Sequence, residues 1–297
     1  MYQEFFEFEE MPFSLTPDTQ FFVNQNSHKV ALSTILVALK HCEGFVKIVG
    51  EVGTGKTLLS RMLMQCLRDN FITVYIPNPY LTPEELKFCV AEQINAQFDK
   101  QMAAHELVWA IENTLRTLEQ QSQQVVVIID EAQAMPRETI ECLRLLTNLE
   151  TEKRKLLQVV MLGQPELDVL LARADLRQLK QRIVFSEVLK PLNFNATRQY
   201  LKNRLESAHP SQPLALSALA YRLIYGASGG IPRLINILAH KSLICAYGRG
   251  HKRISSWHVA RAIRDTGESK RLCRLLAKVF AIELLSPAWP RHVQKAH

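Results

Sequence analysis

The sequence predicts an α/β fold in which a parallel sheet carries helices on both faces and a smaller helical domain follows. Apolar runs of strand length alternate with segments of helical period as far as Leu189. The run Val125–Ile129 contains no polar residue, as expected for a strand that is buried on both faces. The loop GEVGTGKT, residues 50–57, joins an apolar strand to a helix. Together these observations favour a sheet built from βαβ units.

The sequence contains a separate pattern for each predicted strand and helix. A helix begins after Thr82 as its N-cap, because Pro83 suits the first helical position and Glu85 the capping-box position. Short apolar runs predict five strands, which are Val46–Val49, Ile72–Pro77, Val125–Ile129, Leu156–Leu162 and Ile183–Leu189. Apolar residues at helical spacing predict further helices at Lys29–Lys40, Thr57–Arg68 and Ala104–Glu119. Beyond the sheet, the expected helices are Asn195–Glu206, Ser217–Tyr225, Pro232–Ala246 and Ser256–Arg264.

Composition limits the class of protein. The chain has 297 residues, of which 47% are hydrophobic, enough for a large core and a second, smaller domain. Its 6 cysteines are scattered without a C-x-x-C pair, which argues against a disulfide framework or a zinc site. The first residues, MYQEFFEFEEMPF, are acidic where a signal peptide is basic, and no apolar run approaches the length of a membrane span. We therefore expect a cytoplasmic protein.

The charge is unevenly distributed along the chain. From Asn195 onward there are 17 lysines and arginines against four acidic residues, a balance of +13 within a total of +7. The first 194 residues therefore carry a net charge of −6. A basic domain joined to an acidic one indicates an anionic partner, such as nucleic acid, phospholipid headgroups or an acidic protein face. A solvated surface rich in lysine and arginine is the plainer interpretation.

The loop at residues 50–57 fits the pattern G-x-x-x-x-G-K-[ST], which cradles phosphate groups with backbone N–H groups. Its glycines permit the close approach that side chains would block, Lys56 would reach the β- and γ-phosphates of ATP, and the Thr57 hydroxyl would hold Mg²⁺. The predicted nucleotide-binding residues are Gly50, Glu51, Val52, Gly53, Thr54, Gly55, Lys56, Thr57 and Leu58. An ordinary glycine-rich turn is disfavoured, because the required strand and helix flank the loop.

The stretch VVVIIDEAQ places two acids at the end of the central strand. In a parallel sheet the carboxyl ends of the strands form the edge where ligands bind. Asp130 would therefore complete the Mg²⁺ shell, and Glu131 would act as the general base for the water that attacks the γ-phosphate. This adjacent pair favours ATP hydrolysis over phosphoryl transfer to a metabolite. Two solvated acids capping a strand are the alternative.

Several longer stretches carry a family resemblance. They are MPFSLTPDTQFFV, SHKVALSTILVALKHCEGFVKIVGEVGTGKTLLSRML, VVVIIDEAQAMPRETIECLRLLTNLET, VVMLGQPELDVLL, LRQLKQRI and GGIPRLINILAHKSLICAYG. On these residues, from Pro12 to about Arg264, the chain resembles the AAA+ ATPases. More narrowly it is similar to the general secretion pathway protein A (ExeA/GspA) family, and within it to the branch that serves biogenesis of MSHA-type pili.

The resemblance implies further catalytic residues. Gln164 would be the sensor-1 residue beside the γ-phosphate, although asparagine or threonine is more usual there and a surface glutamine is the alternative. Arg233 in GGIPR matches the sensor-2 arginine, which points at the nucleotide from a lid helix. Arg182 in LKQRI matches the arginine finger that one subunit supplies to its neighbour's ATP, with Arg177 as the competing candidate.

Two more positions follow from the resemblance. Phe21–Val23 and His28 would pack against adenine, or alternatively form part of the core under the following helix. Asn78 would restrain Glu131 until a partner binds, or simply form a turn beside proline.

The resemblance also implies a division of the chain. It gives an N-terminal segment near the adenine site (1–27), an AAA+ nucleotide-binding domain (28–192), an α-helical lid domain (193–268), and a basic amphipathic helix with a tail (269–297). The segment 271–285 would lie on an anionic membrane surface or dock a partner, or else pack on the lid. An arginine finger implies a homo-oligomer, in this class a hexameric ring.

Two functions from different classes remain open. The first is an assembly or motor ATPase that helps to build an MSHA-type type IV pilus, or a related type II secretion channel, through a protein partner at the inner membrane; the stretch PFSLTPD favours it. The second is a DNA-bound helper ATPase that loads a transposase or similar enzyme. A nucleotide-dependent scaffold without hydrolysis is disfavoured, because Lys56, Asp130 and Glu131 are all present.

Overall fold

The computed structural model describes residues 2–14, 26–41, 44–68, 70–99, 102–151, 154–208 and 214–269. The chain forms two compact units. The sheet unit comprises Asn26–Val52 and Lys56–Lys190, and the helical unit comprises Met1–Gln25, Gly53–Gly55 and Pro191–His297.

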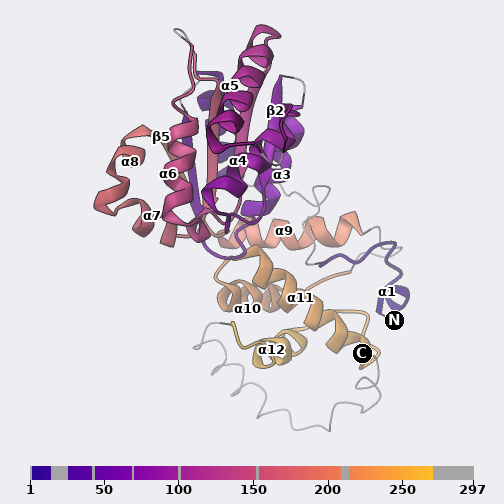
Figure 1. The fold of residues 1–297 in the computed structure, drawn as a ribbon. Coiled ribbons are helices and arrows are strands. Elements are labelled where there is room, and N and C mark those ends of the chain that lie inside the picture. Colours follow the sequence, from indigo (N-terminus) through magenta and orange to yellow (C-terminus); the bar gives the residue numbers. More distant parts are fainter. Residues whose placement is uncertain are drawn as a thin grey trace. The chain divides into compact units, whose positions relative to one another are not determined.

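The sheet unit is built on a parallel sheet in the order β2-β3-β4-β1-β5 (Figure 1). Its strands are β1 (Phe45–Gly50), β2 (Phe71–Ile76), β3 (Gln124–Ile129), β4 (Leu157–Gly163) and β5 (Ile183–Leu189). Its helices are α2 (Asn26–Lys40), α3 (Lys56–Leu67), α4 (Pro83–Gln93), α5 (Ala104–Gln120), α6 (Arg137–Leu146), α7 (Glu166–Leu171) and α8 (Arg177–Arg182), with short 3₁₀ turns η1 (Ala132–Ala134) and η2 (Ala174–Leu176). Each predicted strand is present, with bounds shifted by at most one residue.

The two faces of the sheet have separate cores, because successive side chains of a strand point to opposite sides. Val125, Val127 and Ile129 of β3 pack with residues of α4, α5 and α6. Val126 and Ile128 pack with residues of α2 and α3 on the other face. The unbroken apolar run of β3 is thus explained by helices on both faces, and the predicted α/β fold class is confirmed.

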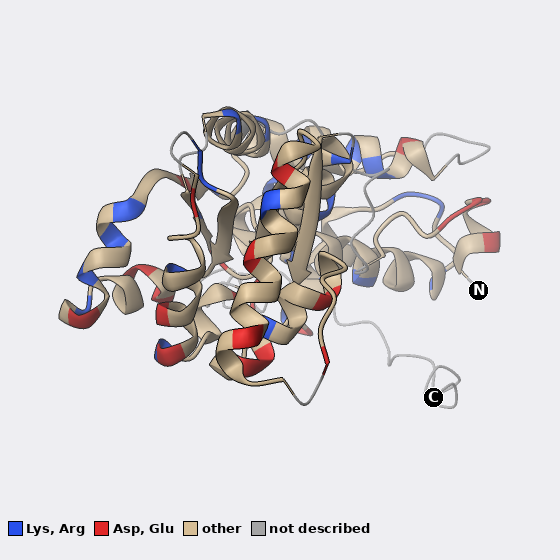
Figure 2. Cartoon of the chain, turned by 45° about the horizontal axis from the view of Figure 1, so that its top comes forward, with Lys and Arg blue, Asp and Glu red and all other residues tan. Residues whose placement is uncertain are grey.

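The helical unit contains α9 (Phe194–Ser207), α10 (Ala218–Ser228), α11 (Pro232–Tyr247) and α12 (Ser256–Arg264), together with the short α1 (Tyr2–Phe5). Its core also takes in aromatic residues of the N-terminal segment, namely Tyr2, Phe6, Phe8 and Phe13. The Tyr2 hydroxyl lies 2.8 Å from Nδ1 of His240 on α11. Acidic residues, red in Figure 2, lie near the N-terminus between these aromatics. The sequence pattern of this segment therefore alternates packing residues with charged ones.

The turn between α10 and α11 has no space for a side chain at Gly230. Gly229 ends α10 in a left-handed conformation, and Gly230 follows with φ of 81°. The Leu192 N–H donates a hydrogen bond of 2.9 Å to the Gly230 carbonyl, so the two backbones run close together. A Cβ on Gly230 would overlap the Leu192 carbonyl oxygen. Only glycine fits this approach.

We predict that Gly230→Ala lowers the free energy of unfolding by more than about 3 kcal/mol, since backbone strain and a backbone clash add together. Gly250→Ala is the matched control, because Gly250 also has positive φ (70°) but a Cβ there would have no atom within 4 Å. The control should lose only about 1 kcal/mol. Urea unfolding of both variants measures the difference, and equal losses would contradict the assignment of the effect to the Leu192 contact.

Candidate functional site

The glycine-rich loop connects the end of β1 to the first turn of α3. Gly50 is the last residue of β1, and Lys56, Thr57 and Leu58 begin α3. Between them Glu51 and Val52 are exposed, whereas Thr54 is buried. Gly53 and Gly55 have φ of 79° and 97°, a backbone conformation that favours glycine. The sequence therefore makes a sharp turn whose N–H groups precede a helix, the arrangement that binds anions.

Lys56 is buried at the base of this loop, with 4% of its surface exposed. Its Nζ donates to the carbonyl oxygens of Gly50 (2.9 Å) and Glu51 (3.2 Å). Burial lowers the pKa of the Lys56 ammonium below its ordinary value, and the carboxylates of Glu131 and Asp130 oppose that shift. The loop's own carbonyls thus hold a buried cation where a phosphate can approach it.

Thr57 and Asp130 meet although 73 residues separate them. The Thr57 hydroxyl donates a 2.7 Å hydrogen bond to Oδ2 of Asp130, and Oδ1 of Asp130 accepts a 3.0 Å hydrogen bond from the Glu131 N–H. Asp130 is only 3% exposed and follows directly on β3. A hydroxyl and a carboxylate at one point suit Mg²⁺, which is bound through one or two carboxylates, waters and substrate phosphates. These two residues can hold the ion that the sequence led us to expect.

Glu131 adopts a left-handed conformation, with φ of 51° and ψ of 38°, at the start of η1. Its Oε2 accepts two amide hydrogen bonds, from Nε2 of Gln133 (2.7 Å) and Nε2 of Gln164 (2.8 Å). Burial on its own would raise the pKa of Glu131, but the hydrogen bonds from both glutamines and the charge of Lys56 outweigh it. The net effect lowers the pKa, so the carboxylate stays ionised near neutral pH.

Gln133 is the residue of this cluster that sequence reasoning missed. It bonds to Glu131 through its nitrogen, and its Oε1 accepts from the Gln164 backbone N–H at 2.9 Å. The only signal was its place two residues after Glu131, within DEAQ. The left-handed turn at Glu131, which brings the two side chains together, is not predictable for a non-glycine residue.

The predicted arginines lie on different elements. Arg182 ends α8 and donates to the side chains of Asn148 and Thr147 in the same unit, whereas Arg177 begins α8 and is exposed. Arg233 is exposed in the first turn of α11. Its backbone N–H donates a 3.2 Å hydrogen bond to the Gly53 carbonyl oxygen. Both residues belong to the helical unit.

Other predicted positions are placed as follows. Asn78 is exposed, and its Oδ1 accepts from the Tyr80 N–H at 3.2 Å, as in an ordinary turn. The Glu131 carboxylate is held by Gln133 and Gln164 instead. His28 is buried near the start of α2. Phe21–Val23 and the segment 271–285 lie outside the described residues.

The described residues contain no cluster of three or more His, Cys, Asp or Glu side chains suited to a metal ion. The site therefore has the donor set of a phosphate site with one hydroxyl–carboxylate pair, rather than that of a metal centre formed by protein ligands alone. It combines a glycine-rich turn at a helix N-terminus, a buried cation, and an ionised carboxylate of which one oxygen already accepts hydrogen bonds. Such a set can bind a polyphosphate and take a proton from water.

Comparison with known proteins gives a consistent result. The model of a protein family described as "AAA domain" matches residues 40–171. The chain is 39% identical over 273 residues to general secretion pathway protein A of Aeromonas hydrophila, an alignment covering 90% of this chain and 50% of that protein. It therefore spans about half the length of this relative.

Similar solved structures include the ORC2 protein of Aeropyrum pernix in its ADPNP-ADP complexes (TM-score 0.63, 16% identity, covering 89% of this chain and 72% of that one). Cdc6p of Pyrobaculum aerophilum has a TM-score of 0.62 at 18% identity, covering 82% and 70%. The RuvB Holliday junction branch migration motor of Thermotoga maritima has a TM-score of 0.52 at 16% identity, covering 85% and 73%. At these identities the likeness shows the fold alone, which is the P-loop AAA+ α/β fold.

Proposed function

The chain is an AAA-domain protein related to general secretion pathway protein A, and we propose that it is a Mg²⁺-dependent ATPase that cleaves ATP with water to ADP and phosphate. The observation that carries the proposal is the meeting of Lys56, Thr57 and Asp130 at the glycine-rich loop, with Glu131 beside them. A nucleotide complex of a protein with the same fold supports the choice of ligand.

Each residue has a distinct role in this proposal. The N–H groups of the loop and the Lys56 ammonium bind the β- and γ-phosphates, and Thr57 and Asp130 hold Mg²⁺. Bound Mg²⁺ neutralises phosphate charge. The Glu131 carboxylate orients the attacking water and takes its proton. Gln164 detects the γ-phosphate, and the Arg233 guanidinium contacts the nucleotide from α11.

We further propose that the ATPase acts in the assembly of a type II secretion channel or an MSHA-type pilus at the bacterial inner membrane. The 39% identity to general secretion pathway protein A supports the secretion role. Resemblance in stretches such as PFSLTPD supports the secretion and pilus branch over a DNA-bound helper, and within that branch we propose the finer assignment to the MSHA pilus biogenesis ATPase MshM. Among the described residues, no helix is both long and apolar enough to cross a membrane. We propose that contact with the membrane is made through a partner protein or the segment 271–285.

Oligomerisation is part of the proposal. A transition-state charge spread over three phosphate oxygens is best stabilised by a planar cation that arrives from outside the site. Arg182 or Arg177 would supply it to the next subunit of a ring, which we expect to be hexameric. Both residues lie on α8. The hydrogen-bond partners of Arg182 are the neutral side chains of Asn148 and Thr147, and its charge also acts on the nearby carboxylate of Glu150.

We predict that Lys56→Ala abolishes ATP binding, because it removes the buried cation. Glu131→Gln should retain binding within about threefold while hydrolysis falls by roughly 10²–10⁴, since only the base is lost. Titration of a fluorescent ATP analogue and release of inorganic phosphate measure the two effects separately. Equal loss of binding in both variants would contradict the separate roles.

The same two variants test the assembly role in cells whose own copy of the gene is deleted. The unmodified protein should restore secretion or surface pili, and neither variant should do so. Restoration of secretion alone supports the secretion assignment, and restoration of pili alone supports the MSHA assignment. Normal secretion and normal pili in the deleted cells would overturn both.

We predict that mixtures of Arg182→Ala and Glu131→Gln subunits recover part of the hydrolysis that each variant lacks alone. In a mixed ring an intact arginine faces an intact Glu131 at some interfaces, so activity should pass through a maximum near equal amounts. Phosphate release measured across mixing ratios checks this. If Arg177→Ala recovers activity in such mixtures and Arg182→Ala retains full activity alone, the finger is Arg177.

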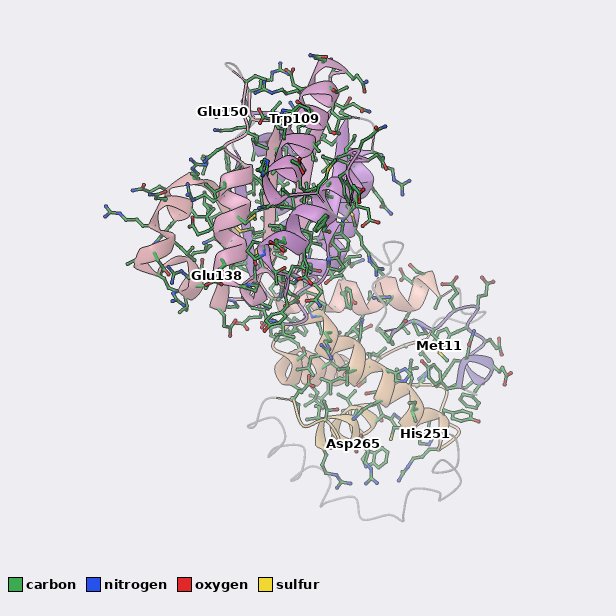
Figure 3. All side chains as sticks on the ribbon, in the orientation of Figure 1. Met11, Trp109, Glu138, Glu150, His251 and Asp265 are labelled. Carbon is green, nitrogen blue, oxygen red and sulfur yellow. The ribbon has the colours of Figure 1, made fainter. Side chains whose placement is uncertain are left out.

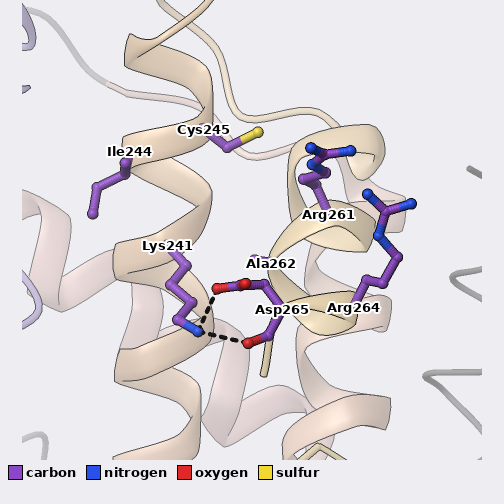
Figure 4. A pocket seen from close by; sticks show the side chains of 7 residues that line it. All are labelled: Lys241, Ile244, Cys245, Arg261, Ala262, Arg264 and Asp265. Atoms are coloured by element: carbon purple, nitrogen blue, oxygen red, sulfur yellow. Dashed lines mark hydrogen bonds and ion pairs between the residues drawn. The ribbon is translucent and has the colours of Figure 1, made fainter. Parts of the chain in front are cut away.

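A second candidate function, a DNA-bound helper ATPase, is favoured by one surface of the helical unit. A pocket of about 370 Å³ lies between α11 and α12, lined by Lys241, Ile244, Cys245, Arg261, Ala262, Arg264 and Asp265 (Figure 4). Lys241 donates to the side chain and the carbonyl of Asp265, at 2.7 and 2.9 Å. Arg261 and Arg264 have no acidic partner among the described residues.

Arg249 lies near this pocket, because its charge opposes the rise that burial causes in the pKa of Cys245, one of the lining residues. The Arg249 guanidinium stacks 3.8 Å from the centroid of the Trp257 ring, on the loop and helix that follow α11. His251 lies on the same loop as Arg249, and Asp265 lies at the end of α12; both are labelled in Figure 3. Unpaired arginines beside a stacked aromatic are suited to phosphodiester groups of nucleic acid.

We predict that the double variant Arg261→Ala with Arg264→Ala weakens binding to duplex DNA and reduces the slope of log affinity against log salt by about 1 to 2, since each lost phosphate contact contributes about 0.9. Fluorescence anisotropy at several salt concentrations measures this. The matched control is Lys202→Ala with Arg222→Ala, which removes two exposed cations on α9 and α10. Equal effects in both double variants, or no binding by the unmodified protein at low salt, would exclude this function for the pocket.

A further inference from the structure

We propose that Gln133 is a positioning residue that ties the Glu131 carboxylate to the backbone of Gln164, so that the base keeps its position when the side chain of the γ-phosphate sensor moves. The inference rests on the proposed ATPase function and deepens it. It starts from a closed set of three hydrogen bonds in the sheet unit. Gln133 contributes to two of them, one through each atom of its amide.

The orientation of the Gln133 amide is fixed by its surroundings. A backbone N–H can only donate, so the Gln133 atom that faces the Gln164 N–H at 2.9 Å has to be its oxygen. The other amide atom is therefore the nitrogen, and it donates to Oε2 of Glu131 at 2.7 Å. An ionised carboxylate only accepts, so both ends agree. A side chain that lacks either a donor or an acceptor breaks one end of the tether.

The space for this amide is provided by Gly163, the last residue of β4. A Cβ at Gly163 would lie 3.1 Å from Oε1 of Gln133 and 2.8 Å from Cδ2 of Leu167. The Gln133 side chain is thus packed against the strand end that leads into Gln164. Glu131 bends toward it because of its left-handed backbone, a conformation that a non-glycine residue adopts at an energetic cost.

The tether has a directional consequence. Gln133 and Gln164 both donate to Oε2 of Glu131, while Oε1 has no partner among the described residues. One carboxylate oxygen is therefore fixed and the other is open to a water molecule. If the Gln164 side chain turns to a γ-phosphate, Gln133 still holds both the carboxylate and the Gln164 backbone. The base then keeps its position while the sensor responds.

Two substitutions separate the two ends of the tether. Gln133→Leu has similar volume and loses both hydrogen bonds. Gln133→Glu keeps an acceptor for the Gln164 N–H but gives no donor to Glu131. Gln121→Leu is the matched control, because Gln121 is exposed at the end of α5. All three leave Lys56 and Thr57 unchanged, so the KM for ATP should stay within about twofold of the unmodified protein.

For the rate of hydrolysis, we expect kcat to fall roughly 10–100-fold in both Gln133 variants and to be unchanged in the control, since a misplaced catalytic group costs about that much. For the backbone contact, hydrogen exchange of the Gln164 amide, followed by NMR without nucleotide, should be about tenfold faster in Gln133→Leu and close to normal in Gln133→Glu. Only the tether predicts this split between the two variants.

The outcomes distinguish this inference from the proposed function. If the unmodified protein binds but does not hydrolyse ATP, the ATPase proposal fails, and the exchange measurement still decides whether Gln133 holds Gln164. If the unmodified protein is active and both Gln133 variants keep normal kcat, the positioning role is overturned. Unchanged exchange of the Gln164 amide in Gln133→Leu overturns the tether itself.

Discussion

The parallel pairing of β3, β4 and β1 is the constraint on which the site depends. In this register Ile129 pairs with Met161, and Val49 pairs with Gly163. Because the strands run in one direction, the residues that follow them, Asp130 and Gln164, emerge at the same edge as the glycine-rich loop. A shift by one residue would turn every side chain of β3 to the opposite face and would separate these groups. The packing of the two apolar cores thus fixes the polar site.

Buried charge at this edge is tolerated because each group has a partner. Lys56 and Asp130 are nearly inaccessible, and an isolated ion in such a place would change its protonation state. Carbonyl oxygens of the loop hold the ammonium, while a hydroxyl and a backbone N–H hold the carboxylate. The two ions therefore do not depend on each other for hydrogen bonding. The site can exchange these partners for phosphate and a cation without leaving either residue unsatisfied.

Sequence reasoning succeeded where the signal is local. The capping box at Thr82 and Glu85 is present with both hydrogen bonds, and the apolar run of β3 is buried on both faces. It did not identify α6 as a separate helix, nor the packing of Tyr2, Phe6 and Phe8 in the core of the helical unit. The contact of Gln133 with Gln164 spans 31 residues and depends on a left-handed Glu131, so no pattern of neighbouring residues could reveal it. Local motifs predicted which residues matter, and tertiary contacts decide what each one touches.

The motif GGIPR shows why the two kinds of reasoning are both needed. The family resemblance explains this motif by a role of Arg233 at the nucleotide. The close approach of the Leu192 backbone, however, already requires glycine at position 230, independently of any role of the arginine. Pro232 suits the first position of α11, and the Arg233 N–H, which has no partner inside the helix, donates to the Gly53 carbonyl. The backbone of Arg233 is thus already engaged, and its exposed guanidinium is the part that remains available to a ligand. A match to this motif is therefore evidence, on its own, for the turn. It becomes evidence for an arginine that contacts nucleotide only when the same chain also contains the phosphate loop.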